Sequence, residues 1–138
     1  MTAGVQALAE RVRSRTVRVS DSIRATLDTI TRHDKGLNAV TRVLSTRALQ
    51  SAAAQDAFLE AGGTPGPLAG VPFGVKDLFD LEGITTTAGS AALANTPPAT
   101  QDALAITRLI RAGAIPVATL NMDEFAYGFV TENAHYGR

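Results

Sequence analysis

Only two short stretches of this chain have the apolar character of buried β-strands, residues 71–76 and 115–118. Between them the sequence predicts an irregular polar loop over 83–100 and a helix over 102–112. A strand, a loop, a helix and a second strand in this order are typical of an α/β protein. Two strands of this length make a poor sheet by themselves. The pattern therefore indicates the opening part of a larger α/β domain.

Residues 1–61 are predicted to be a helical region. An apolar stripe at helical spacing begins at Val5 and predicts the first helix. For the next helix, Ser20 is the expected N-cap and Gly36 the expected stop. The alanine-rich run over 45–60 consists of good helix formers and predicts a third helix.

Residues 62–138 are predicted to be the start of the α/β core. Within it, Thr100 is a plausible N-cap for the helix that precedes the second strand. Asn121, with Glu124 three residues on, resembles a capping box, which predicts a further helix through Tyr127.

The composition excludes several classes of protein. Thirteen basic and thirteen acidic residues cancel, which argues against nucleic-acid binding and against attachment to a membrane surface. The chain has no cysteine and only two histidines, so disulfides, thiolate nucleophiles and zinc clusters are not expected. The N-terminus lacks the features of a signal peptide, and no uncharged stretch is apolar enough to span a membrane. We therefore expect a cytoplasmic protein.

One of the two lysines, Lys76, directly follows the apolar run 71–75. Composition alone favours a lysine at a strand end whose ammonium reaches water. The alternative is a desolvated amine that accepts a proton from a serine hydroxyl and so activates it. A phosphate-binding loop is disfavoured, because Val75 separates Gly74 from Lys76 and the acidic Asp77 follows.

Three longer stretches of the sequence resemble the amidase-signature hydrolases. They are GPLAGVPFGVKDLFDLEGITTTAGS, DALAITRLIRAGAIPVATLNMDEFAYG and TENAHYG. The resemblance runs in order through residues 64–138, and the helical N-terminus fits it more loosely. The stretch NMDEFAYGFVTENAHYG is most similar to the 1-carboxybiuret hydrolase (AtzE-like) branch. The glutamyl-tRNA amidotransferase A chain, a near relative, has a similar sequence in this stretch.

The resemblance implies the fold and the activity. Residues 1–138 would be the truncated N-terminal portion of a single amidase-signature domain, with N-terminal helices and the first strands of a mixed sheet flanked by helices. The complete domain would hydrolyse C–N bonds of small amides or urea-like compounds. Such enzymes use a Ser–cis-Ser–Lys triad and need neither a cofactor nor a metal.

The resemblance also places site residues. It puts the triad lysine on Lys76, which reverses the preference drawn from composition. Phe125, Tyr127 and Thr131 follow the second strand and are expected to line the substrate cleft. In the family, both catalytic serines lie in a glycine- and serine-rich segment that follows the counterpart of Arg138. None of the six serines of this chain has that context, so we predict that the chain alone is inactive.

Two further interpretations stay open. The chain could be a non-catalytic fragment or assembly piece of a protein similar to the amidotransferase A chain, or an inert truncation product. The expected partners are the remainder of the amidase domain, a small-molecule amide substrate of the complete enzyme, and a small accessory subunit. We expect this segment to contact neither nucleic acid nor a membrane.

Overall fold

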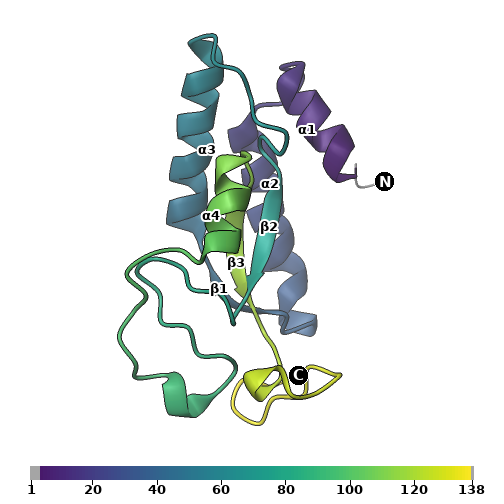
Figure 1. Cartoon of the computed structure of the whole chain (residues 1–138). Helices are drawn as coiled ribbons and strands as arrows, with labels where there is room; N and C mark the ends of the chain where they lie inside the picture. Colours follow the sequence, from purple (N-terminus) through teal and green to yellow (C-terminus); the bar gives the residue numbers. More distant parts are fainter. Residues whose placement is uncertain (1–3, 138) are drawn as a thin grey trace.

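The computed structural model describes residues 4–137. Four helices and three strands form its regular structure (Figure 1). The helices are α1 (Val5–Arg13), α2 (Val19–His33), α3 (Ser45–Glu60) and α4 (Leu104–Arg111). The strands are β1 (Val40–Val43), β2 (Pro72–Lys76) and β3 (Ile115–Leu120). Single 3₁₀ turns are η1 (Asp34–Gly36), η2 (Ala91–Leu93) and η3 (Glu124–Ala126).

The three strands form one mixed sheet in the order β1-β3-β2. β3 lies in the centre, antiparallel to β1 and parallel to β2, and the first five of its six residues are buried. In the parallel pair, Lys76 lies opposite Leu120, so β2 and β3 end at the same edge of the sheet. This mixed sheet flanked by helices confirms the predicted α/β class.

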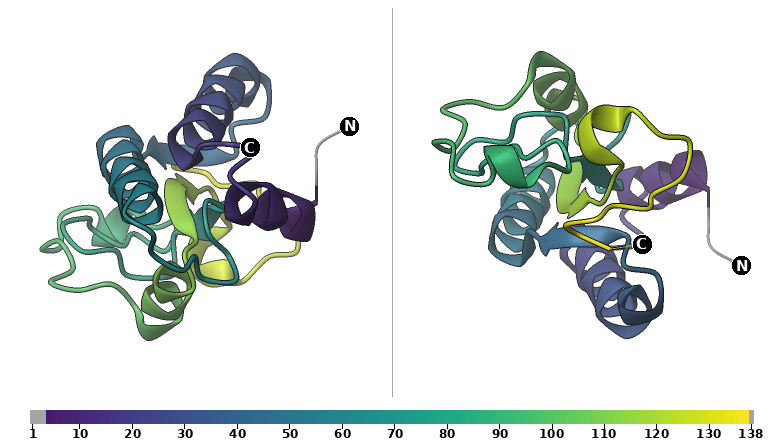
Figure 2. Two further views of the ribbon diagram at one scale, coloured as in Figure 1. Left: turned by 90° about the horizontal axis from the view of Figure 1, so that it is seen from above. Right: turned by 90° about the horizontal axis from the view of Figure 1, so that it is seen from below.

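The helices cover the two faces of β3 (Figure 2). On one face, α2 and α3 pack against each other and against β3, with Ile23, Ala48 and Ile115 in a continuous apolar core. On the other face, Ile106 of α4 packs with Val75 of β2 in a second cluster. No helix within the described residues is both long and apolar enough to cross a membrane.

Residues 1–61, predicted to be a helical region, also contain the strand β1. It is a four-residue edge strand, and only Val40 among its residues is partly buried. Its sequence, VTRV, contains no apolar run that would predict a buried strand. Its pairing with β3 defines it, and that partner lies far along the chain.

Two predicted helix starts and one predicted helix were wrong. α2 begins at Val19 rather than after Ser20, and α4 begins at Leu104 with Ala103 rather than Thr100 at its N-cap. The helix predicted through Tyr127 is only the single turn η3, because Phe125 has a left-handed backbone with φ of 51°. The helix over 45–60 and both predicted strands are present, and β3 extends to Leu120.

Candidate active site beside Lys76

Lys76 lies at the end of β2, where the parallel register brings it beside the segment that follows β3. Its side chain is exposed, and the ammonium makes no hydrogen bond or ion pair with any described residue. The preceding Val75 is almost fully buried. The strand end therefore presents one lysine side chain next to a loop, in a position where other groups can approach it.

A cavity of about 160 Å³ adjoins Lys76. Apart from Lys76, its walls come from the segment that follows β3. These walls are formed by Asn121, Met122, Asp123, Ala126, Gly128, Phe129, Val130 and Thr131. The topology places a cavity at the carboxyl ends of two parallel strands, which is where open α/β sheets bind ligands.

The structure brings one of the three predicted cleft residues to this cavity. Thr131 lines it together with Lys76. Phe125 and Tyr127 do not, and their residues are 58% and 95% exposed. No serine lines the cavity, so it contains a candidate base without either serine of the expected triad.

Sequence reasoning missed most of the cavity wall. Asn121 shapes it from the end of β3 by donating from Nδ2 to the carbonyl oxygens of Asn38 and Gly137, while its Oδ1 accepts from the Met122 N–H. The carboxylate of Asp123 accepts from the Glu132 N–H at 3.1 Å and so closes the loop. These contacts have no periodic signature in the sequence. The only available signal was the predicted capping box at Asn121.

Asp77 is a further missed residue, and it is buried directly behind Lys76. Its carboxylate accepts from the backbone N–H of Thr87 at 3.2 Å and also from the Thr87 hydroxyl. From the sequence, Asp77 was considered only as an argument against a phosphate-binding loop. The structure shows that it joins the end of β2 to the loop that follows.

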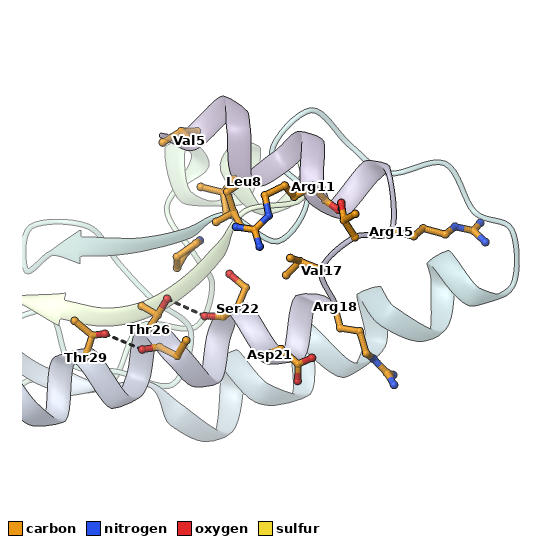
Figure 3. Close-up of a pocket in the computed structure, with 14 residues that line it drawn as sticks. Val5, Leu8, Arg11, Arg15, Val17, Arg18, Asp21, Ser22, Thr26 and Thr29 are labelled. Atoms are coloured by element: carbon orange, nitrogen blue, oxygen red, sulfur yellow. Dashed lines mark hydrogen bonds between the residues drawn. The ribbon is translucent and has the colours of Figure 1, made fainter. Parts of the chain in front are cut away.

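A second, larger cavity of about 860 Å³ lies between α1 and α2 (Figure 3). Leu8 and Val17 contribute apolar surface, and Arg11 points between the two helices while Arg15 and Arg18 point away from them. Its lining includes neither lysine nor histidine. The carboxylate in its lining, Asp21, forms an ion pair with Arg24, so the smaller cavity beside Lys76 is the better candidate for chemistry.

The described residues contain no group of three or more histidine, cysteine, aspartate or glutamate side chains that could hold a metal ion. The buried serine in this part of the fold, Ser90, donates its hydroxyl to Glu124 at 2.6 Å. It is fully buried and outside the cavity lining, so a substrate could not reach it.

Comparisons with known proteins agree with this arrangement. The chain is 50% identical over 111 residues to AtzE, a subunit of the 1-carboxybiuret hydrolase of Pseudomonas sp. (strain ADP), in an alignment that covers 80% of this chain and 24% of that protein. It is 46% identical over 111 residues to the glutamyl-tRNA(Gln) amidotransferase A chain of Aromatoleum aromaticum, with a coverage of 80% and 22%. The chain thus spans about a quarter of the length of these relatives.

The similarity extends to three dimensions. A solved structure, described as a vestigial protein complex that reveals the evolutionary origins of an s-triazine catabolic enzyme, superposes with a TM-score of 0.96 and 44% identity. That superposition covers 98% of this chain and 30% of the solved chain. A sequence profile of the Amidase family matches residues 21–138, which is most of the chain. The chain therefore belongs to the amidase family.

Proposed function

We propose that this chain carries the proton-accepting lysine, Lys76, of an amidase that hydrolyses C–N bonds in small amides or urea-like compounds. The two serines of the Ser–cis-Ser–Lys triad would come from a segment outside these 138 residues. The observation that carries the proposal is the position of Lys76, unpaired at the end of β2 and beside the 160 Å³ cavity.

The position of Lys76 suits a general base whose hydroxyl partner comes from another segment of the protein. In its neutral form, an amine with no carboxylate within ion-pair distance among the described residues can receive a proton from a hydroxyl that enters the cavity. In the proposed reaction, Lys76 takes the proton of the bridging serine, and that serine takes the proton of the nucleophilic serine. The nucleophile attacks the carbonyl carbon and the C–N bond breaks. The proton returns to the leaving nitrogen, and water then hydrolyses the acyl-serine.

The test uses a polypeptide in which this chain is continued by the serine-bearing part of an amidase domain. Lys76→Ala should lower kcat by about 10²–10⁴-fold, which is the usual contribution of a general base. Lys76→Arg should be equally damaging, because a guanidinium stays protonated and cannot accept a proton. The matched control is Lys35→Ala, which removes the other lysine, in η1 and outside the cavity lining. Near-normal kcat in Lys76→Arg would contradict the proposal.

The substrate class follows from the relatives. We propose a urea-like amide first, because one relative is named as part of a 1-carboxybiuret hydrolase. The second candidate is an assembly piece of a protein similar to an amidotransferase A chain, which the 46% identity to such a chain supports. Release of ammonia from biuret derivatives by the continued polypeptide would favour the first candidate, and binding of a partner without such activity would favour the second. The cytoplasmic location and the accessory subunit stay predictions.

A further inference from the structure

We propose that Asp77 is the positioning residue of Lys76, which means that its buried carboxylate fixes the lysine relative to the opposite wall of the cavity. This inference rests on the proposed role of Lys76. Asp77 does not line the cavity, so it would act only through the residues it holds in place.

All four hydrogen-bonding groups of Asp77, two in the backbone and two in the carboxylate, form a hydrogen bond. Its N–H donates to the carbonyl oxygen of Leu120 at 3.3 Å, and its own carbonyl oxygen accepts from the Ala88 N–H at 2.8 Å. Its two carboxylate oxygens accept the N–H and the hydroxyl of Thr87. The residue after Lys76 is therefore bound to β3 on one side and to the loop over 87–88 on the other.

That loop holds the cavity wall in turn. The carbonyl oxygen of Ala88 accepts from the N–H of Phe125 at 2.8 Å. Gly89 is packed so closely that a Cβ on it would lie 2.8 Å from Nδ2 of Asn133 and 2.9 Å from the Met122 carbonyl oxygen. A continuous set of hydrogen bonds thus runs from Asp77 through Ala88 to the segment that forms the cavity wall.

The side chains of Asp77 and Lys76 have opposite environments. Lys76 is exposed beside the cavity, whereas Asp77 is 7% exposed. Lys76 is the last residue of β2 and Asp77 begins the turn that follows, and burial alternates across the two, from buried Val75 to exposed Lys76 to buried Asp77. Anchoring the carboxylate inside the protein therefore directs the lysine outward, toward the cavity. A buried carboxylate needs hydrogen-bond donors, and Thr87 supplies two.

The same part of the chain offers a matched control. Asp80 accepts from the hydroxyl of Thr86 at 2.6 Å, so it forms a second aspartate–threonine pair between the same two segments. That pair is exposed and has no link to the cavity wall. Loss of Asp80 removes a carboxylate of the same charge near Lys76 without releasing the strand end.

The experiment measures amide hydrolysis by the continued polypeptide with Asp77→Ala, Asp77→Asn and Asp80→Ala. We expect Asp77→Ala to lower kcat by about 10²-fold, as a displacement of about 1 Å at a reacting group does. Asp77→Asn should keep most of the activity, because its Oδ1 can accept from the Thr87 N–H while Nδ2 donates to the hydroxyl. Asp80→Ala should match the wild type.

Normal kcat in a folded Asp77→Ala variant overturns the proposal. Equal losses in Asp77→Ala and Asp77→Asn overturn it as well, because charge rather than position would then matter. Should Asp77→Ala fail to fold, Thr87→Val removes only the hydroxyl of the pair, and Thr87→Ser restores it. Lowered kcat in the first variant and recovery in the second support the positioning role, and unchanged kcat in Thr87→Val contradicts it.

A spectroscopic test in the 138-residue chain separates this inference from the proposed function. The chain has two lysines, so ¹³C-labelled lysine gives two sets of side-chain signals. Asp77→Ala and Thr87→Val should move the Lys76 signals and leave those of Lys35, whereas Asp77→Asn should leave both near their wild-type positions. Unmoved Lys76 signals in Thr87→Val overturn the positioning role whatever the enzyme assay shows. A completed protein that lacks amidase activity contradicts only the proposed function.

Discussion

Asn133 uses the full hydrogen-bonding capacity of its side chain inside the protein. Nδ2 donates to the carbonyl oxygens of Gly89 and Met122 at 2.6 and 2.9 Å. Oδ1 accepts from the backbone N–H groups of His135 and Tyr136 at 2.8 and 3.0 Å. The residue is 6% exposed, so water cannot replace these contacts. One amide thus joins the 88–90 loop, the end of β3 and the last residues of the chain.

Asn133→Asp should destabilise the chain strongly. The new carboxylate cannot donate, so it would face two carbonyl oxygens that have lost their donors. We expect a loss of about 2 kcal/mol or more in the free energy of unfolding, measured by urea denaturation. The exposed Asn95 is the matched control, and Asn95→Asp should change the stability by less than about 0.5 kcal/mol. Equal effects of the two substitutions would contradict this account.

At the candidate site, sequence reasoning had mixed success. Resemblance to a family placed the proposed catalytic role on Lys76, and the structure puts Thr131 at the same cavity. Phe125 and Tyr127 lie outside its lining, because the left-handed residues in η3 turn the chain away from a regular helix. Asp77 was not recognised as a structural residue. Its partner Thr87 is ten positions away in a loop without periodicity.

Among the elements, α2 is capped at its N-terminus by a side chain from another helix, far along the sequence. No side chain at the N-cap position accepts a hydrogen bond there. Instead, Asp56 of α3 accepts from the N–H groups of Val19 and Ser20 at 2.8 and 3.1 Å. Burial, the largest influence, acts to raise the pKa of Asp56. The hydrogen bonds from Ser20 and Val19, together with the charge of Arg18, outweigh it and lower the pKa below 3.8.

This lowered pKa predicts a stability change in acid. Well above pH 3.8, Asp56 is ionised in both states and its contribution is complete. As the pH falls through 3.8, the unfolded chain takes up a proton before the folded chain does, so stability decreases until the pH passes the folded-state pKa. Asp56→Asn should lower stability at neutral pH and flatten this part of the acid profile, measured by urea unfolding between about pH 2 and 6.

The control for Asp56 is Asp28→Asn, an exposed substitution in α2. Asp28→Asn should show the same dependence of the free energy of unfolding on pH as the wild type. An identical profile for the wild type and Asp56→Asn would show that the cap contributes nothing that depends on pH.

Local sequence predicts best the elements whose formation depends mainly on their own residues. Helix α3 and strands β2 and β3 have clear composition and apolar runs, and each was predicted close to its observed range. The start of α2 depends on Asp56, and β1 depends on hydrogen bonds to β3. Such long-range partners leave no periodic pattern in the segment they stabilise.

For the molecule as a whole, the segment after η3 presents apolar side chains to solvent. Tyr127 and Phe129 are almost completely exposed, and Val130 is 62% exposed. These side chains lie next to one another along the chain. Contiguous exposed apolar surface favours association.

We therefore expect the 138-residue chain to self-associate, and Phe129→Ser to reduce this association without lowering the melting temperature. Sedimentation velocity over a range of concentrations measures the effect. The control is Leu37→Ser, which removes a single exposed apolar residue outside that segment and should sediment like the wild type. A wild-type chain that is monomeric at all concentrations would contradict the prediction.

The position of β3 in the sheet also affects the order in which the protein can fold during synthesis. β1 and β2 do not pair with each other, and each pairs only with β3, the last of the three strands in the chain. Helices α1 to α3 can form as they leave the ribosome, because their hydrogen bonds are local. No hydrogen bond of the sheet can form until β3 has been made, and the first two strands keep both edges open until then. These three strands are thus joined in one step, by the strand that pairs with the other two.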